Sequence, residues 1–279
     1  CILWNLETGS IIKTLFGHTE TVSAISITPD GKKAITGSYD KTCILWNLET
    51  NSIIKTLFGH TDGISAALVT PDGKSAVSGS WDNTCIVWSL ETGQAIKAYP
   101  ENREVDSISI TPNGKIALSG CNDGTCILWN LETGQAVKAF CGHTDRVSTV
   151  SITPDGKRAL TGSNDNTCIL WNIETGQAVK TFYGHTDRVS IISITPDGKR
   201  VLSGSYDNTC ILWDLENGQL IKTFIGHSSG IEAISITPDG KRAITSSDKT
   251  CILWDMEMGV AIKILFGHTE TVYDVSITP

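Results

Sequence analysis

The sequence predicts an all-β fold built from repeated units, and three observations lead to this prediction. A Cys-Ile-Leu/Val-Trp tetrapeptide occurs seven times, with spacings of 42, 42, 41, 42, 42 and 41 residues between successive copies. A complete unit contains four short runs rich in β-branched residues and has no helical period. Turn sequences with Gly, Asn and Asp separate the runs. Four short strands repeated at this period are typical of the blades of a β-propeller.

One unit gives the order of the elements. In the unit that starts at Gly142, the four runs are residues 147–153, 157–162, 167–172 and 177–182. Thr-Pro-Asp-Gly joins the first two, with Gly where a hairpin turn requires a positive φ. An Asn/Ser-x-Asp segment and a Glu-Thr-Gly segment supply the other turns. The tetrapeptide lies in the third run, and its copies begin at Cys1, Cys43, Cys85, Cys126, Cys168, Cys210 and Cys251.

The two ends of the chain set the expected number of blades. The chain starts at a third strand and stops after a first strand, so it supplies seven first, six second, seven third and seven fourth strands. We therefore expect a single domain over residues 1–279, a seven-bladed ring of four-stranded antiparallel blades. Six blades are complete, and a seventh is built from 1–16 and 272–278 and closed by both termini. It lacks its second strand, which leaves backbone groups unpaired and suggests a segment of a longer array.

Charge and hydropathy narrow the class of partner. The chain has 40% hydrophobic and 19% charged residues, a net charge of −8 and a pI near 5.2. Sequence-independent binding of nucleic acid needs a basic surface, so no nucleic-acid partner is expected. Apolar stretches of four to six residues are too short to cross a bilayer, and no signal-like segment opens the chain. No membrane association is expected.

The nine cysteines have a structural interpretation. Thiols that recur once per blade at the same height lie too far apart for disulfides, and no Cys-x-x-Cys spacing suggests zinc. We interpret the repeated thiols as small apolar side chains buried between blades. So many unpaired thiols favour a reducing, cytoplasmic location. No metal and no cofactor are expected.

Three recurring sequence marks resemble the WD40 repeat family, and the resemblance covers the whole chain. A Gly-His pair precedes the first strand, and its histidines are His18, His60, His143, His185, His227 and His268. An Asp lies in the turn after the second strand, at Asp40, Asp82, Asp123, Asp165, Asp207 and Asp248. A Trp-Asp-like pair ends the third strand, with the aspartate kept only at Asp214 and Asp255. The uniform repeats also resemble the WD40 arrays of bacterial multidomain signalling proteins, in which the propeller is a sensor or scaffold.

The repeated Asp, His and Ser or Thr residues could suggest nucleophilic catalysis. A catalytic site is built once, however, whereas this set recurs in most units. The resemblance implies a hydrogen-bond relay in which the turn Asp accepts from the His ring, and a strand hydroxyl links the His to the Trp indole. The expected hydroxyls belong to Thr36, Ser78, Ser119, Thr161, Ser203 and Thr245. In one unit Glu101 stands where His belongs, so the relay to Asp123 is either lost or replaced by a shared proton or water.

Functional residues are expected where near-identical repeats differ. Variation concentrates just before the turn Asp and on either side of the Val or Ile that opens the first strand. All three positions are expected on the Gly-His face, around the mouth of the central channel. Aromatic and Arg side chains dominate interface energies. We therefore expect a partner-binding face centred on Tyr39, Trp81 and Tyr206, with Arg146 and Arg188 opposite Glu104 and Asp106. The remaining candidates at these positions are Asn122, Asn164 and Tyr273; the competing explanation is drift on a solvated rim.

Three functional interpretations follow. The leading one is a non-catalytic protein–protein interaction scaffold or sensor that binds a protein or peptide on the Gly-His face. The second is a small-ligand or glycan-binding propeller, which needs equivalent pockets repeated between blades. The third is an enzyme with a site on the channel axis, which needs a non-repeated group of His, Asp or Glu. No such group is found in the sequence, so no catalytic residue is assigned.

Overall fold

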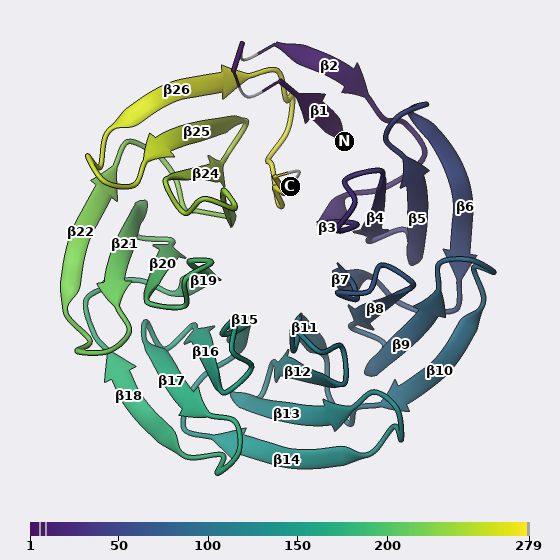
Figure 1. The fold of residues 1–279 in the computed structure, drawn as a ribbon, viewed down its shortest axis with the longest axis horizontal. Coiled ribbons are helices and arrows are strands. Elements are labelled where there is room, and N and C mark those ends of the chain that lie inside the picture. Colours follow the sequence, from purple (N-terminus) through teal and green to yellow (C-terminus); the bar gives the residue numbers. More distant parts are fainter. Residues whose placement is uncertain (6, 9, 278–279) are drawn as a thin grey trace.

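The fold is a ring of β-sheets arranged around a common axis (Figure 1). It is seen in a computed structural model that describes residues 1–5, 7–8 and 10–277. Six sheets have four antiparallel strands each, ordered along the sheet as they are in the chain. The first strand of each sheet lies nearest the axis and the fourth lies on the circumference. We number these sheets as blades 1 to 6 in chain order.

The strands of the complete blades are short and regular. Blades 1 and 2 contain β3 (Val22–Ile27), β4 (Lys33–Ser38), β5 (Thr42–Asn47), β6 (Ser52–Phe58), β7 (Ile64–Val69), β8 (Ser75–Ser80), β9 (Thr84–Ser89) and β10 (Ala95–Pro100). Blades 3 and 4 contain β11 (Val105–Ile110), β12 (Ile116–Cys121), β13 (Thr125–Asn130), β14 (Ala136–Cys141), β15 (Val147–Ile152), β16 (Arg158–Ser163), β17 (Cys168–Asn172) and β18 (Ala178–Phe182). Blades 5 and 6 contain β19 (Val189–Ile194), β20 (Arg200–Ser205), β21 (Thr209–Asp214), β22 (Leu220–Ile225), β23 (Ala233–Ile236), β24 (Arg242–Ser247), β25 (Thr250–Asp255) and β26 (Ala261–Phe266).

The prediction of seven blades is wrong in its number. Between blades 6 and 1 lies a two-stranded sheet of β1 (Ile2–Trp4) and β2 (Ile11–Thr14). Beyond β26, the described part of the C-terminal segment contains no strand, and it turns inward from the rim (Figure 1). The physical reason is the missing second strand: Val272–Ile277 has no neighbour with which to form a ladder. We call this region the seventh sector; Thr278, assigned to the seventh blade from sequence, lies outside the described residues.

The predicted turns adopt the backbone conformations that their residues favour. In the Thr-Pro-Asp-Gly turn of blade 1, Gly31 has φ of 69°. The Thr28 hydroxyl donates to Asp30 at 2.6 Å and accepts from the Lys33 N–H at 2.9 Å. In blades 1 to 5 the residue after the turn Asp is left-handed as well, as at Asn83 with φ of 65°, a conformation that Asn tolerates. Short polar turns therefore fix where each strand ends.

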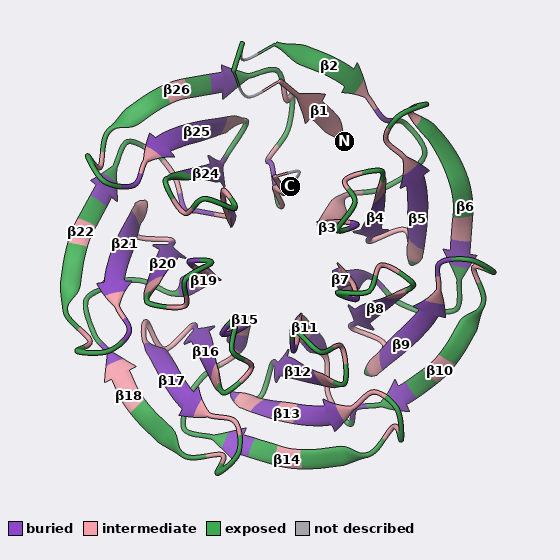
Figure 2. Cartoon of the chain, in the orientation of Figure 1, coloured by how far each residue is buried: buried purple, intermediate pink, exposed green. Residues whose placement is uncertain are grey.

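Apolar side chains between successive blades form the core. One cluster joins blades 1 and 2 through Leu45, Leu57, Ile64 and Trp88, and similar clusters join each following pair. In Figure 2 the third strands are largely buried and the outer strands are largely exposed. The repeated cysteines of the complete blades lie in these interfaces, and all nine cysteines are free. The interpretation of the repeated thiols as buried apolar side chains is therefore confirmed for the complete blades.

A lysine on each fourth strand ties its blade to the next one. Lys97 Nζ donates to the Glu132 carbonyl oxygen at 2.6 Å, and Lys222 Nζ donates to that of Glu257 at 2.6 Å. Lys263 of blade 6 makes the same contact with the Glu7 carbonyl in the seventh sector, at 3.0 Å. These contacts lie at the rim opposite the Gly-His segments. The lysines at this rim thus hold neighbouring blades together.

Candidate functional site

The recurring His, hydroxyl and Trp side chains form a relay inside the blades. In blade 2, His60 Nδ1 lies 2.9 Å from Asp82 Oδ2, and His60 Nε2 lies 2.7 Å from Ser78 Oγ. The Trp88 indole N–H donates to the same hydroxyl at 2.7 Å. Complete relays with the same three contacts centre on His18, His143 and His185. The relay implied by the family resemblance is confirmed in these four blades.

Burial determines which groups of the relay donate a proton in each hydrogen bond and which accept. Burial lowers the pKa of His60, although Asp82 opposes the shift, so the imidazole is neutral at pH 7. Burial alone would raise the pKa of Asp82, but hydrogen bonds from Thr84, the Thr61 N–H and His60 hold it below its usual range. The neutral ring therefore donates from Nδ1 to the carboxylate and accepts at Nε2 from the hydroxyl. The relay satisfies buried polar groups within the blade, which is a structural role.

Blade 3 replaces the His with a buried carboxyl group. Glu101 is only 2% exposed, and its Oε1 accepts from the Ser119 hydroxyl at 2.6 Å and from the Trp129 indole. Asp123 is turned away and pairs with Arg103. Burial raises the pKa of Glu101, while the hydrogen bonds from Ser119 and Trp129 oppose the shift. Of the two sequence alternatives, loss of the relay to Asp123 is therefore the correct one, although Glu101 keeps the inner contacts with Ser119 and Trp129.

Backbone hydrogen bonds bring two of the variable positions together on the Gly-His face. The residue before the turn Asp donates its N–H to the carbonyl of the residue before the first strand. In blades 1 to 5 these pairs are Tyr39 with Thr21, Trp81 with Gly63, Asn122 with Glu104, Asn164 with Arg146, and Tyr206 with Arg188. Five near-invariant blades thus each present one variable pair at the same place. Asn122 is exposed, and Asn164 and Glu104 are half-buried.

Side chains from four blades meet in what we call the Trp81 cluster, formed by Tyr39, Trp81, Asp106 and Arg146. The rings of Tyr39 and Trp81 are 4.8 Å apart between centroids. The Trp81 indole N–H donates to Asp106 at 3.3 Å. Arg146 Nε donates to the other oxygen of Asp106 at 2.8 Å, and its Nη2 donates to the first. The Asp106 side chain is 3% exposed and that of Arg146 is 38% exposed, so the guanidinium covers the carboxylate.

A second group, the Tyr206 cluster, contains Arg188, Tyr206 and Glu232. The guanidinium carbon of Arg188 lies 3.6 Å from the centroid of the Tyr206 ring, a cation–π arrangement. The Tyr206 hydroxyl donates to Glu232 Oε1 at 2.7 Å. Burial and this hydrogen bond raise the pKa of Tyr206 to about 12. Arg188 therefore stacks on Tyr206.

Charged and phenolic groups of both clusters and of the C-terminal segment affect the pKa of Tyr39. Burial raises the pKa of Tyr39, and the Tyr273 hydroxyl, Glu232 and Asp106 add to the shift, whereas Arg146 opposes it. These groups come from blades 3, 4 and 6 and from the seventh sector. Tyr273 is 40% exposed. The structure thus gathers sequence-predicted residues around the axis on the Gly-His face.

Glycines in the next blade make room for the aromatic rings. A Cβ atom on Gly230 would lie 2.8 Å from the Tyr206 ring, and one on Gly63 would lie 3.2 Å from Trp81 and 3.3 Å from Tyr39. These glycines and Glu232 were not among the site residues predicted from the sequence. A signal was present: each Tyr that precedes a turn Asp is followed, one repeat later, by Gly at the start of the first strand.

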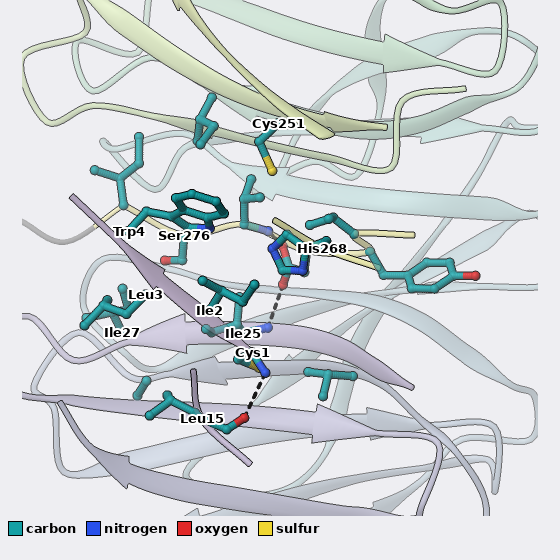
Figure 3. Close-up of a pocket in the computed structure, with 18 of the residues that line it drawn as sticks. Cys1, Ile2, Leu3, Trp4, Leu15, Ile25, Ile27, Cys251, His268 and Ser276 are labelled. Carbon is teal, nitrogen blue, oxygen red and sulfur yellow. Dashed lines mark hydrogen bonds between the residues drawn. The ribbon is translucent and has the colours of Figure 1, made fainter. Parts of the chain in front are cut away.

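The seventh sector holds a cavity of about 400 Å³ (Figure 3). Its walls come from β1, from the Thr271–Ile277 segment, from Ile25 and Ile27 of blade 1, and from Cys251 of blade 6. Asp274 lies in this wall, where its carboxyl accepts from the backbone N–H of Ile25 at 2.6 Å. Burial raises the pKa of Asp274 to about 7. This cavity was not predicted from the sequence, because the two termini were expected to pair.

Residues 1–5, 7–8 and 10–277 hold no group of three His, Cys, Asp or Glu side chains placed to bind a metal ion. Over the same residues, no helix has the length and apolar character needed to span a membrane.

Antiparallel blades around one axis, most of them held by a His–hydroxyl–Trp relay, define the class of protein: a repeat-built β-propeller. The family model described as "WD domain, G-beta repeat" matches six segments, residues 9–47, 51–89, 93–130, 134–172, 176–214 and 218–255. The chain therefore belongs to the WD40 family. A comparison with the curated proteins finds no match.

Proposed function

We propose that this propeller is a non-catalytic scaffold or sensor that binds a protein or peptide on its Gly-His face. WD40 propellers are a fold commonly used for protein–protein interaction. One observation supports the choice of face: the positions that differ between near-identical repeats form the Trp81 and Tyr206 clusters. A surface built from aromatic and Arg side chains suits an interface, because these residue types carry most of the binding energy.

The clusters are held in place before any partner arrives. Trp81 is fixed by its hydrogen bond to Asp106 and by the Tyr39 ring, and Arg188 rests on Tyr206. Side chains that are already ordered lose less conformational entropy when a partner binds. A rigid ring with pre-positioned aromatic side chains is therefore suited to recognition of an extended segment or a protein surface.

The proposal also includes the absence of catalysis and of a nucleic-acid partner, and a cytoplasmic location. The His, hydroxyl and Asp groups hydrogen-bond to one another inside individual blades, which supports a non-catalytic role without a cofactor. The net charge of −8 supports a partner other than nucleic acid. Nine free cysteines support a reducing compartment, the cytoplasm. We do not propose a membrane partner.

A selection experiment tests the proposed face. A displayed peptide library is selected on the immobilised propeller, and the Kd of enriched peptides is measured for the unmodified protein and for the Trp81→Ala and Arg188→Ala variants. Lys199→Ala, an exposed substitution at the opposite rim, is the matched control. We expect Trp81→Ala or Arg188→Ala to weaken binding by about tenfold or more, as for an interface hot spot, and Lys199→Ala to leave it unchanged. Equal affinities in all four proteins would contradict the proposal.

A further inference from the structure

A cavity of about 500 Å³ lies between blades 2 and 3, at the rim opposite the Gly-His face. Its walls come from the Thr-Pro-Asp-Gly turn of blade 2, from β9 and β10, and from the two turns of blade 3 at the same rim. Sites for small molecules typically have volumes of about 300–1,000 Å³, so this cavity is large enough to hold one. Its lining residues differ from those of the two clusters on the Gly-His face.

Two short side chains of blade 2 explain why the cavity occurs at this junction. Ser75 is the first residue of the second strand, and Val87 precedes the Trp of the third strand. The other five complete blades have longer side chains at both positions: Lys33, Ile116, Arg158, Arg200 and Arg242 at the first, and Leu45, Leu128, Leu170, Leu212 and Leu253 at the second. Val87 packs in the core that joins blades 2 and 3. The shorter side chains therefore leave space that is filled in the other blades.

Contacts between the two blades enclose the cavity on both sides. Nearer the axis, the turns of the two blades approach closely, since a Cβ atom on Gly114 would lie 3.7 Å from the Pro71 ring. Toward the circumference, Lys97 Nζ donates to the Glu132 carbonyl oxygen at 2.6 Å. These contacts form the cavity before a ligand arrives, so binding costs little conformational entropy. They also close both ends, so the cavity suits a small free molecule better than an extended chain.

The inner wall of the cavity is built from uncharged side chains. Thr70 and Val87 are buried there, and Ser75 and Leu131 are half-buried. The charged lining residues are all exposed, and they are Asp72, Lys115 and Glu132. A charged group of a ligand would lose its hydration inside the cavity and would gain no opposite charge there. An uncharged ligand is therefore favoured.

Two polar groups of the lining are available to a ligand. The Ser75 hydroxyl makes no hydrogen bond to any residue that the structure describes. Asn113 uses its oxygen to accept from the Thr111 hydroxyl at 2.7 Å and from the Lys115 N–H at 3.0 Å, so its amide NH₂ group can donate to a ligand. Asn113 stands where the other Thr-Pro-x-Gly turns have Asp. Blade 3 thus offers a neutral donor at a place where the other blades have a carboxylate.

We propose that this cavity binds a small uncharged molecule that has an apolar body and a hydroxyl or amide group, as a phenol does. The apolar body packs against Val87, Ile96 and Leu131, and the polar group hydrogen-bonds to Ser75 or Asn113. The site lies at the opposite rim from the Gly-His face, and it does not depend on the proposed function.

Titration of the whole chain with para-ethylphenol, followed by NMR shifts of the backbone amides, tests the ligand class. Tyramine and phloretate have the same body and add an ammonium or a carboxylate group. We expect saturable shifts at Ser75, Val87 and Leu131 with para-ethylphenol, and Kd values about tenfold higher or more for the two charged compounds. Equal affinity for either charged compound would overturn the uncharged class. Shifts confined to other residues, or no saturable shift, would overturn the site.

Substitutions that fill the cavity test the site independently. Ser75→Arg with Val87→Leu introduces the residues that blade 5 has at these positions, so the double variant should fold and should not bind para-ethylphenol. Ser75→Arg alone should weaken binding. Arg200→Lys, at the same position in blade 5, is the matched control and should leave the Kd unchanged, as should Trp81→Ala on the Gly-His face. An unchanged Kd in Ser75→Arg would overturn the proposal. Tighter binding of N-acetyltyrosinamide than of para-ethylphenol would overturn it in favour of a tyrosine side chain of a protein partner.

Discussion

At the residue scale, the relay depends on one hydroxyl that serves two rings. Thr161 is fully buried, and its Oγ1 lies 2.7 Å from His143 Nε2 and 2.8 Å from the Trp171 indole nitrogen. Since burial lowers the pKa of His143, the ring is neutral and needs the hydroxyl proton at Nε2. Removal of the hydroxyl leaves one acceptor and one donor without a partner in the core.

We therefore expect Thr161→Val to lower the free energy of unfolding by about 1–3 kcal/mol, the usual cost of unsatisfied buried polar groups. Valine has nearly the same shape, so loss of packing contributes little. Urea unfolding followed by tryptophan fluorescence measures the change. Thr186→Val is the control, because Thr186 is exposed. If the two variants were equally stable, the relay would have no energetic role.

Glu101 makes the stability of the protein decrease as pH rises. The blades that have a relay histidine in its place lack this contribution. Its folded pKa is raised above the usual 4.5, chiefly by burial. A carboxyl with a raised folded pKa contributes stability that is fully present below its unfolded pKa and is lost as pH rises through its folded pKa. Glu101→Gln keeps an acceptor for Ser119 and Trp129 and removes the charge.

We expect the stability of Glu101→Gln relative to the unmodified protein to increase as pH rises from about 4 to 8. The difference between the two proteins isolates Glu101 from other titrating groups, since these are common to both. Urea unfolding of both proteins at several pH values provides the measurement. A difference that stays constant over this range would show that Glu101 does not change its protonation there.

At the element scale, the strands and their turns follow from local sequence, whereas the clusters between blades do not. Four strands per unit, the turn glycines and the relay histidines repeat at fixed offsets, so one repeat predicts the others. The pair between Asp106 and Arg146 joins different blades, and its geometry depends on the angle between neighbouring sheets. The sequence showed that both positions vary but could not specify which charges meet.

The same distinction explains the error at the seventh sector. The sequence pattern correctly identifies a third strand at Ile2–Trp4, because β1 pairs with the following β2. It also predicts a first strand at 272–278, but a strand forms through hydrogen bonds to a neighbour, and the second strand is missing. Local pattern therefore predicts a strand reliably only where its pairing partner is present.

The fit between a first strand and the aromatic residue of the preceding blade leads to a prediction for Gly230. An added Cβ would lie 2.8 Å from the Tyr206 ring and 3.1 Å from the Tyr206 Cα, so the backbone limits any shift. Gly230→Ala should displace Tyr206, break its hydrogen bond to Glu232 and cost about 1–3 kcal/mol of stability, as overpacking does.

A double-mutant cycle checks this cause. In a Tyr206→Asn background, where the ring is absent, Gly230→Ala should cost much less, as measured by thermal or urea unfolding. Thr21→Ala, at the equivalent place in blade 1, is the control because it removes atoms and adds none. An equal cost of Gly230→Ala in both backgrounds would mean that the ring is not what the new methyl group meets.

At the scale of the whole molecule, a few contacts hold the ring together across the seventh sector. Lys263 donates to the Glu7 carbonyl at one rim, at 3.0 Å. Nearer the axis, the carboxyl of Asp274 joins the C-terminal segment to β3 through the Ile25 N–H. Other blade junctions have a full apolar core, so this junction is expected to open first.

Asp274 makes the closure of this junction sensitive to pH. Its folded pKa is raised to about 7 from 3.8 by burial, although the N–H groups of Ile25 and Val275 favour the charged form. By the same linkage argument, the stability that the docked segment gains is present at low pH and is lost as pH rises through about 7. Hydrogen exchange at Val272–Ile277, corrected for intrinsic rates, should therefore be faster at pH 8.5 than at pH 5.5. Asp274→Asn, which keeps an acceptor for Ile25 and carries no charge, should remove this dependence. If both proteins showed the same change in exchange with pH, another group would control the junction.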